Sequence, residues 1–465
     1  VALARAMKPR GAPADALFHA ERAARQGDSS TATLLLLGEL LTTVGRTRDA
    51  ERAYRAAARD SSARALALYR RARLLARIGD PGAAAALSGF AHAFPADSAA
   101  PTALYTVGDL LADRGDTTGS ERWLGELIAR YPADPRASLA RFRLAARAWR
   151  VDRLDSAAAL YRAEVEAAAP QRFGARFWLG KLAWRRGDTT EARALWRALA
   201  RDDSIGYYGL RARRETDLPP LTIAAAPPAA TSPAAVTVLA RIDTLVLAGL
   251  DSEARAEVRQ VLARPPQELV ELLAWSDGLA VRGWGSAAVR LGWQAALRAP
   301  TDPRVLRAIY PWPNRAAVEG EAAEFGVDPL LFVAIVRQES VFDTEALSPA
   351  GARGLAQLMP GTATLTARGL DVSFSPEWIT VPDLNLHLGA AHLADLLERF
   401  GGRLEAAVAA YNAGPRPIAR WLTRPGTEDP DQFIELIPFQ ETRGYVRVVL
   451  RNRDLYRALY APPNN

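Results

Sequence analysis

Glu339 occupies the position in this sequence that most strongly suggests chemistry. Asp328 and Pro329 predict a helix start, since Asp caps a first turn and Pro suits the first helical position. Glu339 follows Ile335 by four residues, which places it on the apolar and therefore buried face of that helix. Burial disfavours a charged carboxylate, and so does the C-terminal end of a helix. Both effects favour a protonated Glu339 near neutral pH, which is the state that a general acid needs.

Three later segments support a catalytic role for Glu339, which could otherwise be an ordinary ion-pair partner of Arg337 or Arg353. Residues 348–363 read SPAGARGLAQLMPGTA, with clustered glycines and prolines, one Gln and one of the two Met residues of the chain. Residues 409–415 read AAYNAGP, and residues 437–446 read IPFQETRGYV. Each segment is several residues long, and their order and spacing form a combination that is more specific than any single piece.

These segments, with the Glu339-Ser340 pair, resemble the motifs of the soluble lytic transglycosylases of bacterial cell walls. Members of that family carry a Glu-Ser pair followed by GLMQ(L/I)MP, AYNAG and IP(F/Y)xETR stretches. The resemblance covers roughly Ile309 to Tyr460. It implies a lysozyme-like α+β catalytic domain, mostly helical with a small β element, behind a helical superhelix. The predicted fold is therefore mostly α.

The resemblance also implies a reaction. The substrate would be peptidoglycan, cut at the β-1,4 bond between N-acetylmuramic acid and N-acetylglucosamine to leave a 1,6-anhydromuramyl end without water. Glu339 would be the sole catalytic residue. It would first protonate the glycosidic oxygen and then accept the proton of the muramyl C6 hydroxyl, which attacks C1 after the N-acetyl group has assisted.

By the same resemblance, six residues would bind substrate: Ser348, Gln357, Met359, Tyr411, Asn412 and Glu441. Ser348 would contact the N-acetyl group, while Gln357 and Met359 would line the saccharide groove. Glu441 would sit in that groove and orient the substrate. One departure from the family is Ala356, which stands where Met is usual and is expected to alter the side of the groove.

The remaining carried-over roles concern support of the acid. Tyr411 would hydrogen-bond Glu339, and Asn412 would support the end of the helix that carries Tyr411. Three further residues are expected to be supporting: Ser340, Gly354 and Tyr445.

The number of carboxylates favours the anhydro-forming reaction. A glycosidase that activates water typically needs two carboxylates. Asp343 and Glu345 lie near Glu339, but in a polar stretch that fixes neither as a base. Two alternatives stay open: a hydrolytic muramidase, and a glycan-binding repeat scaffold with an inactive lysozyme-like domain.

We predict no metal centre and no cofactor. His387 and His392 are five residues apart rather than the four of a zinc-binding helix, and the chain contains no cysteine. It also lacks a Walker loop and a strand–GxGxxG–helix pattern.

The first half of the sequence is helical in composition and repeats. Gly-Asp pairs begin at Gly79, Gly115 and Gly187, which are 36 and then 72 residues apart. Gly suits the left-handed turn between two helices, and Asp caps the second helix. A period of ~34–36 residues resembles tetratricopeptide repeats, whose helix hairpins stack into a superhelix. Aromatic residues that recur in these repeats are predicted to be core: Tyr54, Trp123, Tyr161 and Trp196.

Proline-rich stretches divide the chain into three predicted regions. Residues 1–217 would form the repeat superhelix, residues 218–312 a Pro-rich linker and a second helical region, and residues 313–465 the lysozyme-like domain.

Composition limits the partners and the location. The 465 residues carry 59 basic and 52 acidic side chains, and the scattered arginines read as solvated helix faces rather than a nucleic-acid site. No apolar run is long enough for a transmembrane helix, and the start at Val1 is interpreted as trimmed or processed. The expected partners are peptidoglycan strands and, through the repeats, proteins of cell-wall synthesis or the divisome. The expected location is the periplasm or cell envelope.

Overall fold

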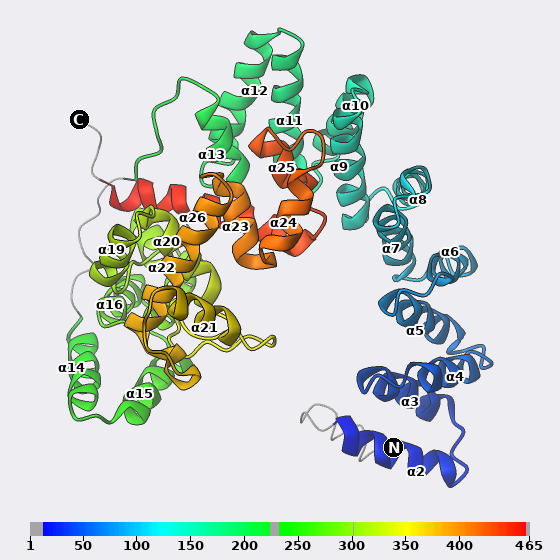
Figure 1. Ribbon diagram of the computed structural model, residues 1–465, viewed down its shortest axis with the longest axis horizontal. Coiled ribbons are helices and arrows are strands. Elements are labelled where there is room, and N and C mark those ends of the chain that lie inside the picture. Colours follow the sequence, from blue (N-terminus) through cyan, green and yellow to red (C-terminus); the bar gives the residue numbers. More distant parts are fainter. Residues whose placement is uncertain (1–12, 224–231, 301, 462–465) are drawn as a thin grey trace. The chain divides into compact units, whose positions relative to one another are not determined.

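The computed structural model describes residues 13–223, 232–300 and 302–461, and these residues are almost entirely helical (Figure 1). Their β structure consists of two isolated antiparallel bridges, Leu347 with Arg353 and Arg353 with Leu358. The predicted mostly α class is confirmed. None of the helices in the described ranges combines the length and the apolar character needed to cross a membrane.

Packing divides the chain into two units, Val1–Gly187 and Asp188–Asn465. The predicted boundaries at 217 and 312 stay predictions, and residues 224–231 of the predicted linker lie outside the described residues. The helices of the first unit are α2 (Pro13–Arg25), α3 (Thr31–Thr43), α4 (Thr47–Ala57), α5 (Arg64–Arg77), α6 (Ala83–Ala93), α7 (Ala100–Asp113), α8 (Thr117–Arg130), α9 (Pro135–Arg150), α10 (Leu154–Glu166) and α11 (Arg172–Arg185).

Helix hairpins form the first unit, and their turns follow the predicted chemistry. Gly79, Gly115 and Gly187 each follow the end of a helix and take positive φ angles of 71°, 82° and 87°. Asp116 caps α8, and Asp188 caps α12 (Thr189–Asp202) at the start of the second unit, each by accepting a hydrogen bond from a backbone N–H group. Asp80 is the exception, because the N-cap of α6 is Gly82 and no side chain caps that helix. The predicted hairpin repeat is confirmed, with the predicted Asp cap at two of the three Gly-Asp pairs.

Aromatic and small residues fill the spaces between these helices. Tyr54 and Tyr161 are buried, and Trp123 is partly buried, as the repeat pattern predicts. Trp196, in the first helix of the second unit, is buried as well. Gly108 shows how close the packing is, since a Cβ added there would lie 2.7 Å from Leu124. Burial of this apolar surface is what stabilises a stack of hairpins, because no single hairpin can cover its own apolar face.

The second unit contains the segment of chemical interest. Its helices are α12 (Thr189–Asp202), α13 (Tyr207–Arg214), α14 (Pro233–Leu247), α15 (Asp251–Ala263), α16 (Leu269–Ala280), α17 (Gly285–Ala296), α18 (Pro303–Ile309), α19 (Arg315–Glu324), α20 (Pro329–Ser340), α21 (Pro360–Gly369), the 3-10 helix η2 (Pro376–Thr380), α22 (Pro382–Arg399), α23 (Leu404–Ala413), α24 (Pro415–Leu422), α25 (Pro430–Leu436) and α26 (Gln440–Tyr460).

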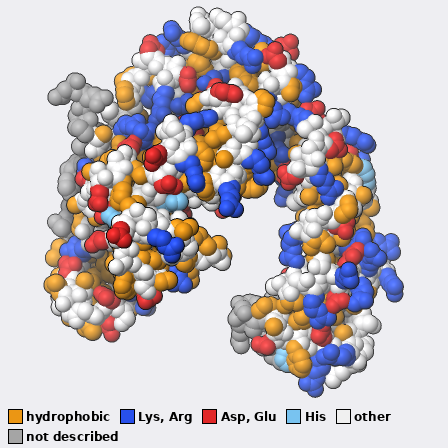
Figure 2. Space-filling model, in the orientation of Figure 1, with side chains coloured by type: hydrophobic (Ala, Val, Ile, Leu, Met, Phe, Trp, Pro, Cys, Tyr) orange, Lys and Arg blue, Asp and Glu red, His pale blue; other side chains and the backbone are white. Residues whose placement is uncertain are grey.

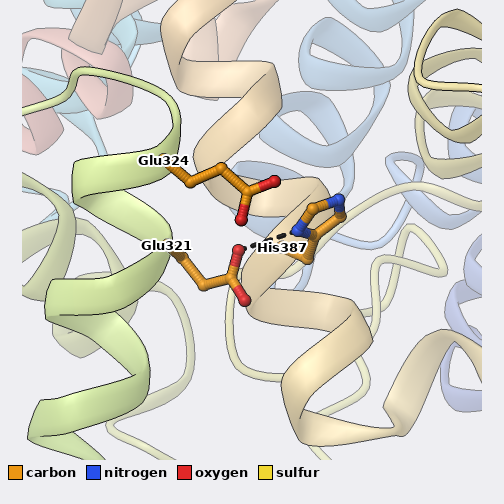
Figure 3. A group of neighbouring side chains, drawn as sticks. All are labelled: Glu321, Glu324 and His387. Carbon is orange, nitrogen blue, oxygen red and sulfur yellow. Dashed lines mark hydrogen bonds and ion pairs between the residues drawn. The ribbon is translucent and has the colours of Figure 1, made fainter.

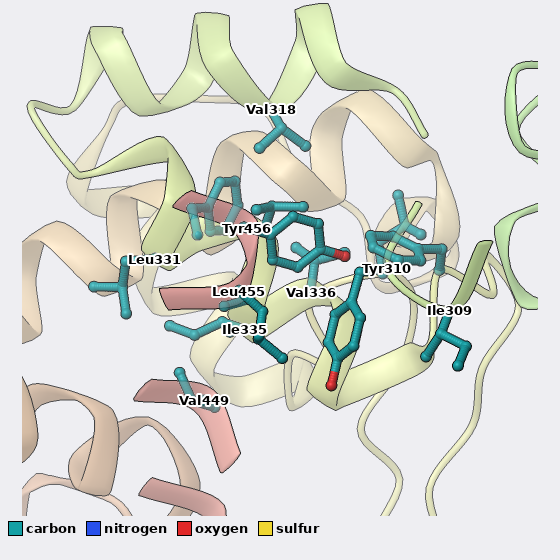
Figure 4. Packing of buried hydrophobic residues seen from close by; sticks show 14 of the residues in the cluster. Ile309, Tyr310, Val318, Leu331, Ile335, Val336, Val449, Leu455 and Tyr456 are labelled. Carbon is teal, nitrogen blue, oxygen red and sulfur yellow. The ribbon is translucent and has the colours of Figure 1, made fainter. Parts of the chain in front are cut away.

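Helix α20 lies in the core of this unit. All six residues from Leu331 to Val336 are at most 1% exposed, so the helix is covered on every side over this stretch. Figure 4 shows Ile335 and Val336 near Leu455 and Tyr456 of α26. Each fully buried Leu, Ile or Phe of this kind contributes about 1.5–3 kcal/mol, so α20 is held firmly against α26.

Polar contacts join α13 to α25 and α26. The Tyr208 hydroxyl donates to Glu435 Oε1 at 2.8 Å, and Arg211 forms an ion pair with Asp431 at 2.9 Å. Arg447 of α26 also pairs with Glu435. Helices α25 and α26 therefore pack with α13, which precedes Asp431 and Glu435 by more than two hundred residues in sequence.

Charged side chains are dispersed over the visible surface. Figure 2 shows Lys and Arg interspersed with acidic and apolar side chains on the face in view. Many arginines form exposed ion pairs within or between neighbouring helices, for example Arg46 with Asp49 and Arg315 with Glu319. This pattern agrees with solvated helix faces.

Candidate active site

Helix α20 places Glu339 at its C-terminal end, as the sequence predicts. Asp328 caps the helix by accepting a hydrogen bond from the Leu330 N–H at 2.9 Å, and Pro329 follows at the first position. Glu339 is partly buried. Burial raises the pKa of its carboxyl group to about 7, although the hydrogen bond from Tyr445 acts in the opposite direction. Glu339 can therefore hold a proton near neutral pH.

An arginine partner for Glu339 is absent among the described residues. Arg337 instead donates from Nε and Nη2 to the carbonyl oxygen of Ile309, at 3.2 and 3.0 Å, and its guanidinium lies 4.1 Å from the centre of the Tyr310 ring. The ordinary ion pair considered from the sequence is therefore not formed with Arg337, and the carboxyl group keeps its raised pKa.

The tyrosine that contacts Glu339 is Tyr445, which lies on α26. Its hydroxyl donates to Glu339 Oε1 at 2.5 Å. Burial and the nearby Glu339 charge both raise the pKa of Tyr445 well above its usual range, so this hydroxyl stays protonated and acts as a donor. The sequence placed Tyr445 only among the supporting residues.

Tyr411 does not form the hydrogen bond that the sequence analysis expected. Its hydroxyl donates to the carbonyl oxygen of Ala356 at 2.9 Å, so the expected bond to Glu339 is wrong. The reason is the packing of α20 on α26, which brings the Tyr445 hydroxyl within hydrogen-bond distance of the Glu339 carboxyl. Tyr411 is still electrostatically close, because the charge of Glu339 adds to burial in raising the pKa of Tyr411.

Asn412 connects the end of α23 to α26. Its Oδ1 accepts a hydrogen bond from the Thr442 hydroxyl at 2.7 Å, and Thr442 is buried. Since Tyr445 lies one turn further along α26, this bond helps to fix the position of its hydroxyl. Glu441, in the first turn of α26, is exposed.

The turn after α20 has an unusual backbone. Val341 and Phe342 both take left-handed φ angles, 50° and 63°, which residues other than Gly rarely adopt. Ser340 holds this reversal: its hydroxyl donates to the Val336 carbonyl at 3.1 Å and accepts from the Phe342 N–H at 3.0 Å. Ser340 thus has a structural task beside Glu339.

Residues 346–358 form a loop that is bonded mainly to itself. The Ser348 hydroxyl accepts from the Ala352 N–H at 3.0 Å, and the Gln357 amide donates to the carbonyls of Ala346 and Gly354, both at 2.9 Å. Both N–H groups of Gln357 are used within the loop, which leaves its carbonyl oxygen for other partners. The groove-lining roles of Ser348 and Gln357 stay predictions.

Asn385 of α22 anchors this loop and was missed by the sequence analysis. It is fully buried, accepts from the Ala356 N–H at 2.7 Å, and donates to the carbonyls of Arg353 and Ile379 at 3.1 and 2.7 Å. Gly354 makes this possible, because a Cβ there would lie 2.5 Å from Asn385 Nδ2. A polar residue on the apolar face of α22 was the available sign in the sequence.

Ala356, in the 346–358 loop, and Met359, directly after it, differ in their exposure. Met359 is 43% exposed, whereas Ala356 is completely buried in a small core with Leu358, Ile379 and Leu388. The expectation that Ala356 alters the side of a groove is therefore wrong: the residue faces the core, where its Cβ would lie 2.6 Å from any Cβ added at Gly389.

Part of the second unit is similar to known proteins. Residues 317–434 match the family model described as the transglycosylase SLT domain. The soluble lytic murein transglycosylase of Escherichia coli strain K12 is 42% identical over 128 residues, which are 27% of this chain and 20% of that protein. A putative soluble lytic murein transglycosylase of Haemophilus influenzae is 41% identical over 134 residues, or 28% of this chain and 23% of that protein. The chain thus spans about a fifth of the length of these curated relatives.

Solved structures resemble a larger part of the chain. An inactive mutant of the lytic transglycosylase Slt from Pseudomonas aeruginosa has a TM-score of 0.68 and 25% identity, over 98% of this chain and 81% of that one. The 70 kDa soluble lytic transglycosylase of Escherichia coli has a TM-score of 0.70 and 21% identity, over 98% of this chain and 80% of that one. The likeness in fold confirms the predicted class, a helical superhelix with a lysozyme-like domain.

Proposed function

We propose that this chain is a peptidoglycan lytic transglycosylase, because residues 317–434 match the transglycosylase SLT domain model. It cleaves the β-1,4 bond between N-acetylmuramic acid and N-acetylglucosamine and leaves a 1,6-anhydromuramyl end. Glu339 is the single catalytic acid and base.

The pKa of Glu339, raised to about 7 by burial, is the observation that carries this proposal. A general acid works best when its pKa lies near the working pH, because a large fraction is protonated while the proton remains easy to transfer. Protonated Glu339 gives its proton to the glycosidic oxygen as the C1–O bond breaks, and the substrate N-acetyl group assists at C1.

The second step uses the ionised form of the same side chain. The muramyl C6 hydroxyl attacks C1, its proton passes to Glu339, and the enzyme returns to its starting state with no water consumed. The Tyr445 hydroxyl donates to Glu339 Oε1 and so stabilises the carboxylate between the two steps. An intramolecular nucleophile explains why one glutamate is sufficient.

Nearby carboxylates support this one-glutamate chemistry, because the two closest in sequence have other partners. Glu345 forms an ion pair with Arg255 at 2.7 Å, and Asp343 accepts a hydrogen bond from the Glu345 N–H at 3.0 Å. Both are exposed. A hydrolase would need a second carboxylate positioned to activate water.

Digestion of purified sacculi tests the proposal. Mass analysis of the muropeptides is expected to find anhydromuramyl ends with the wild-type chain and none with Glu339→Gln. Products with reducing ends alone would replace the proposal with a hydrolytic muramidase. Equal products from wild type and Glu339→Gln would contradict Glu339 as the acid, and no products from either would favour a glycan-binding scaffold.

Location and partners follow from the same substrate. We place the chain in the periplasm or cell envelope, where peptidoglycan lies, and assign the exposed faces of the hairpin repeats to proteins of cell-wall synthesis or division. Immunoblotting of fractionated cells checks the location, and recovery only with cytosolic markers would contradict it. Crosslinking in intact cells checks the partners: recovery of wall-synthesis or division proteins is expected only while the repeats are present.

A further inference from the structure

Three potential metal ligands come together on the second unit, at a place that the sequence analysis passed over. Glu321 and Glu324 lie on the last turns of α19, and His387 lies on α22 (Figure 3). One ligand atom from each residue lies within 4.8 Å of the other two. His387 Nδ1 is 2.8 Å from Glu321 Oε2. Glu321 and His387 are 66 positions apart in the sequence, which hides this grouping from a search for closely spaced ligands.

Electrostatics at this place favour a cation. Glu321 and Glu324 stand at the C-terminal end of α19, where the helix dipole is negative and disfavours anions. Within the described ranges, neither carboxylate forms an ion pair with Lys or Arg; Glu321 pairs with His387. Glu319, on the same helix, has Arg315 as its partner. Two close carboxylates repel each other, so a positive charge between them would relieve a real cost.

The donor set identifies the class of ion. One imidazole with two carboxylates suits first-row transition ions such as Zn²⁺, which accepts nitrogen and oxygen ligands at four positions. Ca²⁺ and Mg²⁺ prefer sites made of oxygen alone and need more ligands. We propose that Glu321, Glu324 and His387 form a Zn²⁺-type site, with water as the remaining ligand.

Such an ion would have a structural effect. It would join α19 to α22, and α22 also carries Asn385, which holds residues 353–356 through two hydrogen bonds. Metal binding is therefore expected to stabilise the second unit against unfolding, because only the folded chain brings the three ligands together. The site requires nothing of Glu339, so it can be tested without any activity.

Calorimetric titration of the tag-free, chelator-treated full chain with ZnCl₂ is the test. The expected result is one ion bound per chain, with release of protons and a higher unfolding temperature. His387→Ala and Glu324→Gln should each weaken binding by at least about 10-fold, the loss that even outer-shell changes cause at metal sites. Glu324 is exposed, so its substitution is expected to leave folding intact.

Matched controls keep the result specific. Glu319→Gln changes a glutamate on the same helix, and His92→Ala removes a histidine that pairs with Glu126 in the first unit. Both should bind Zn²⁺ as the wild type does. No Zn²⁺ binding by the wild type, binding that survives Glu324→Gln, or binding of Ca²⁺ in preference to Zn²⁺ would overturn the proposal.

Discussion

Replacing Glu339 with Gln should stabilise the chain while removing the proposed acid. The folded carboxyl has a pKa of about 7 because of burial, whereas the ordinary value is 4.5. Between these two values the folded chain keeps a proton that the unfolded chain releases. The free energy of unfolding of the wild type therefore falls as pH rises from 4.5 to about 7, and the loss is complete above that pH.

The size of this effect follows from the shift. One pKa unit corresponds to about 1.4 kcal/mol, so the difference between 4.5 and about 7 corresponds to about 3 kcal/mol. A Gln side chain is neutral at every pH and resembles the protonated carboxyl. The stability of Glu339→Gln relative to wild type should thus increase by about 3 kcal/mol across this window and then level off.

Urea unfolding followed by circular dichroism at about pH 5, 6, 7 and 8 measures this difference, and other titrating groups cancel between the two chains. Because the chain has two units, the transition that the substitution moves is the one to compare. Glu319→Gln is the control, since it breaks an exposed pair with Arg315 and should change stability by no more than about 0.5 kcal/mol. A stability difference that is constant from about pH 5 to 8 would refute burial as the cause of the raised pKa.

Further substitutions test the supporting structure. Tyr445→Phe removes the hydrogen bond that lowers the pKa of the candidate acid, so the alkaline limb of the pH–rate profile should move up by about one unit; an unchanged limb would contradict this role. Asn385→Ala leaves the buried Ala356 N–H and Ile379 carbonyl without partners, whereas the Arg353 carbonyl keeps the Leu358 N–H; the change should cost at least about 2 kcal/mol, with faster amide exchange confined first to the loop that Asn385 anchors. Gly108→Ala should lower the free energy of unfolding by about 1–3 kcal/mol, because the added Cβ displaces Leu124. Gly125→Ala, where a Cβ meets nothing within 4 Å, should raise it by about 1 kcal/mol. Equal effects of the two substitutions in thermal unfolding would contradict the close packing at Gly108.

Local rules in the sequence were sufficient for the acid and its helix. A cap, a proline and an apolar stripe fixed the start and the buried face of α20, and Glu339 followed from the helical period. The hairpin turns were equally local, since Gly115 and Asp116 need only each other and the adjoining helices. Features of this kind depend on residues within one or two turns.

Contacts between distant segments could not be predicted in the same way. Tyr411 and Tyr445 both stand in recognisable motifs, and only the packing of α20 on α26 decides that Tyr445 reaches Glu339. Glu321 and His387 meet for a similar reason, because α19 packs on α22. Spacing along the chain carries no information about such pairs, which depend on how helices cross.

Ala356 shows how a motif can be right in position and wrong in role. A family pattern gives the residue type at this point but not the direction of its side chain, which in the structure enters the core opposite Gly389. The absence of a side chain on Gly389 and the small one on Ala356 allow α22 to approach the loop closely. That approach brings Asn385 within hydrogen-bond distance of the loop backbone.

Strain and support are found together around the candidate acid. Val341, Phe342 and Gln357 all take left-handed φ angles, each of which costs on the order of 1–3 kcal/mol. Such conformations persist only where neighbours compensate, and here the buried Phe342 ring and the hydrogen bonds of Ser340 and Gln357 do so. The turn after α20 and the 346–358 loop are thus held in shape before any substrate arrives, which is what the proposed two-step action of Glu339 on one sugar would require.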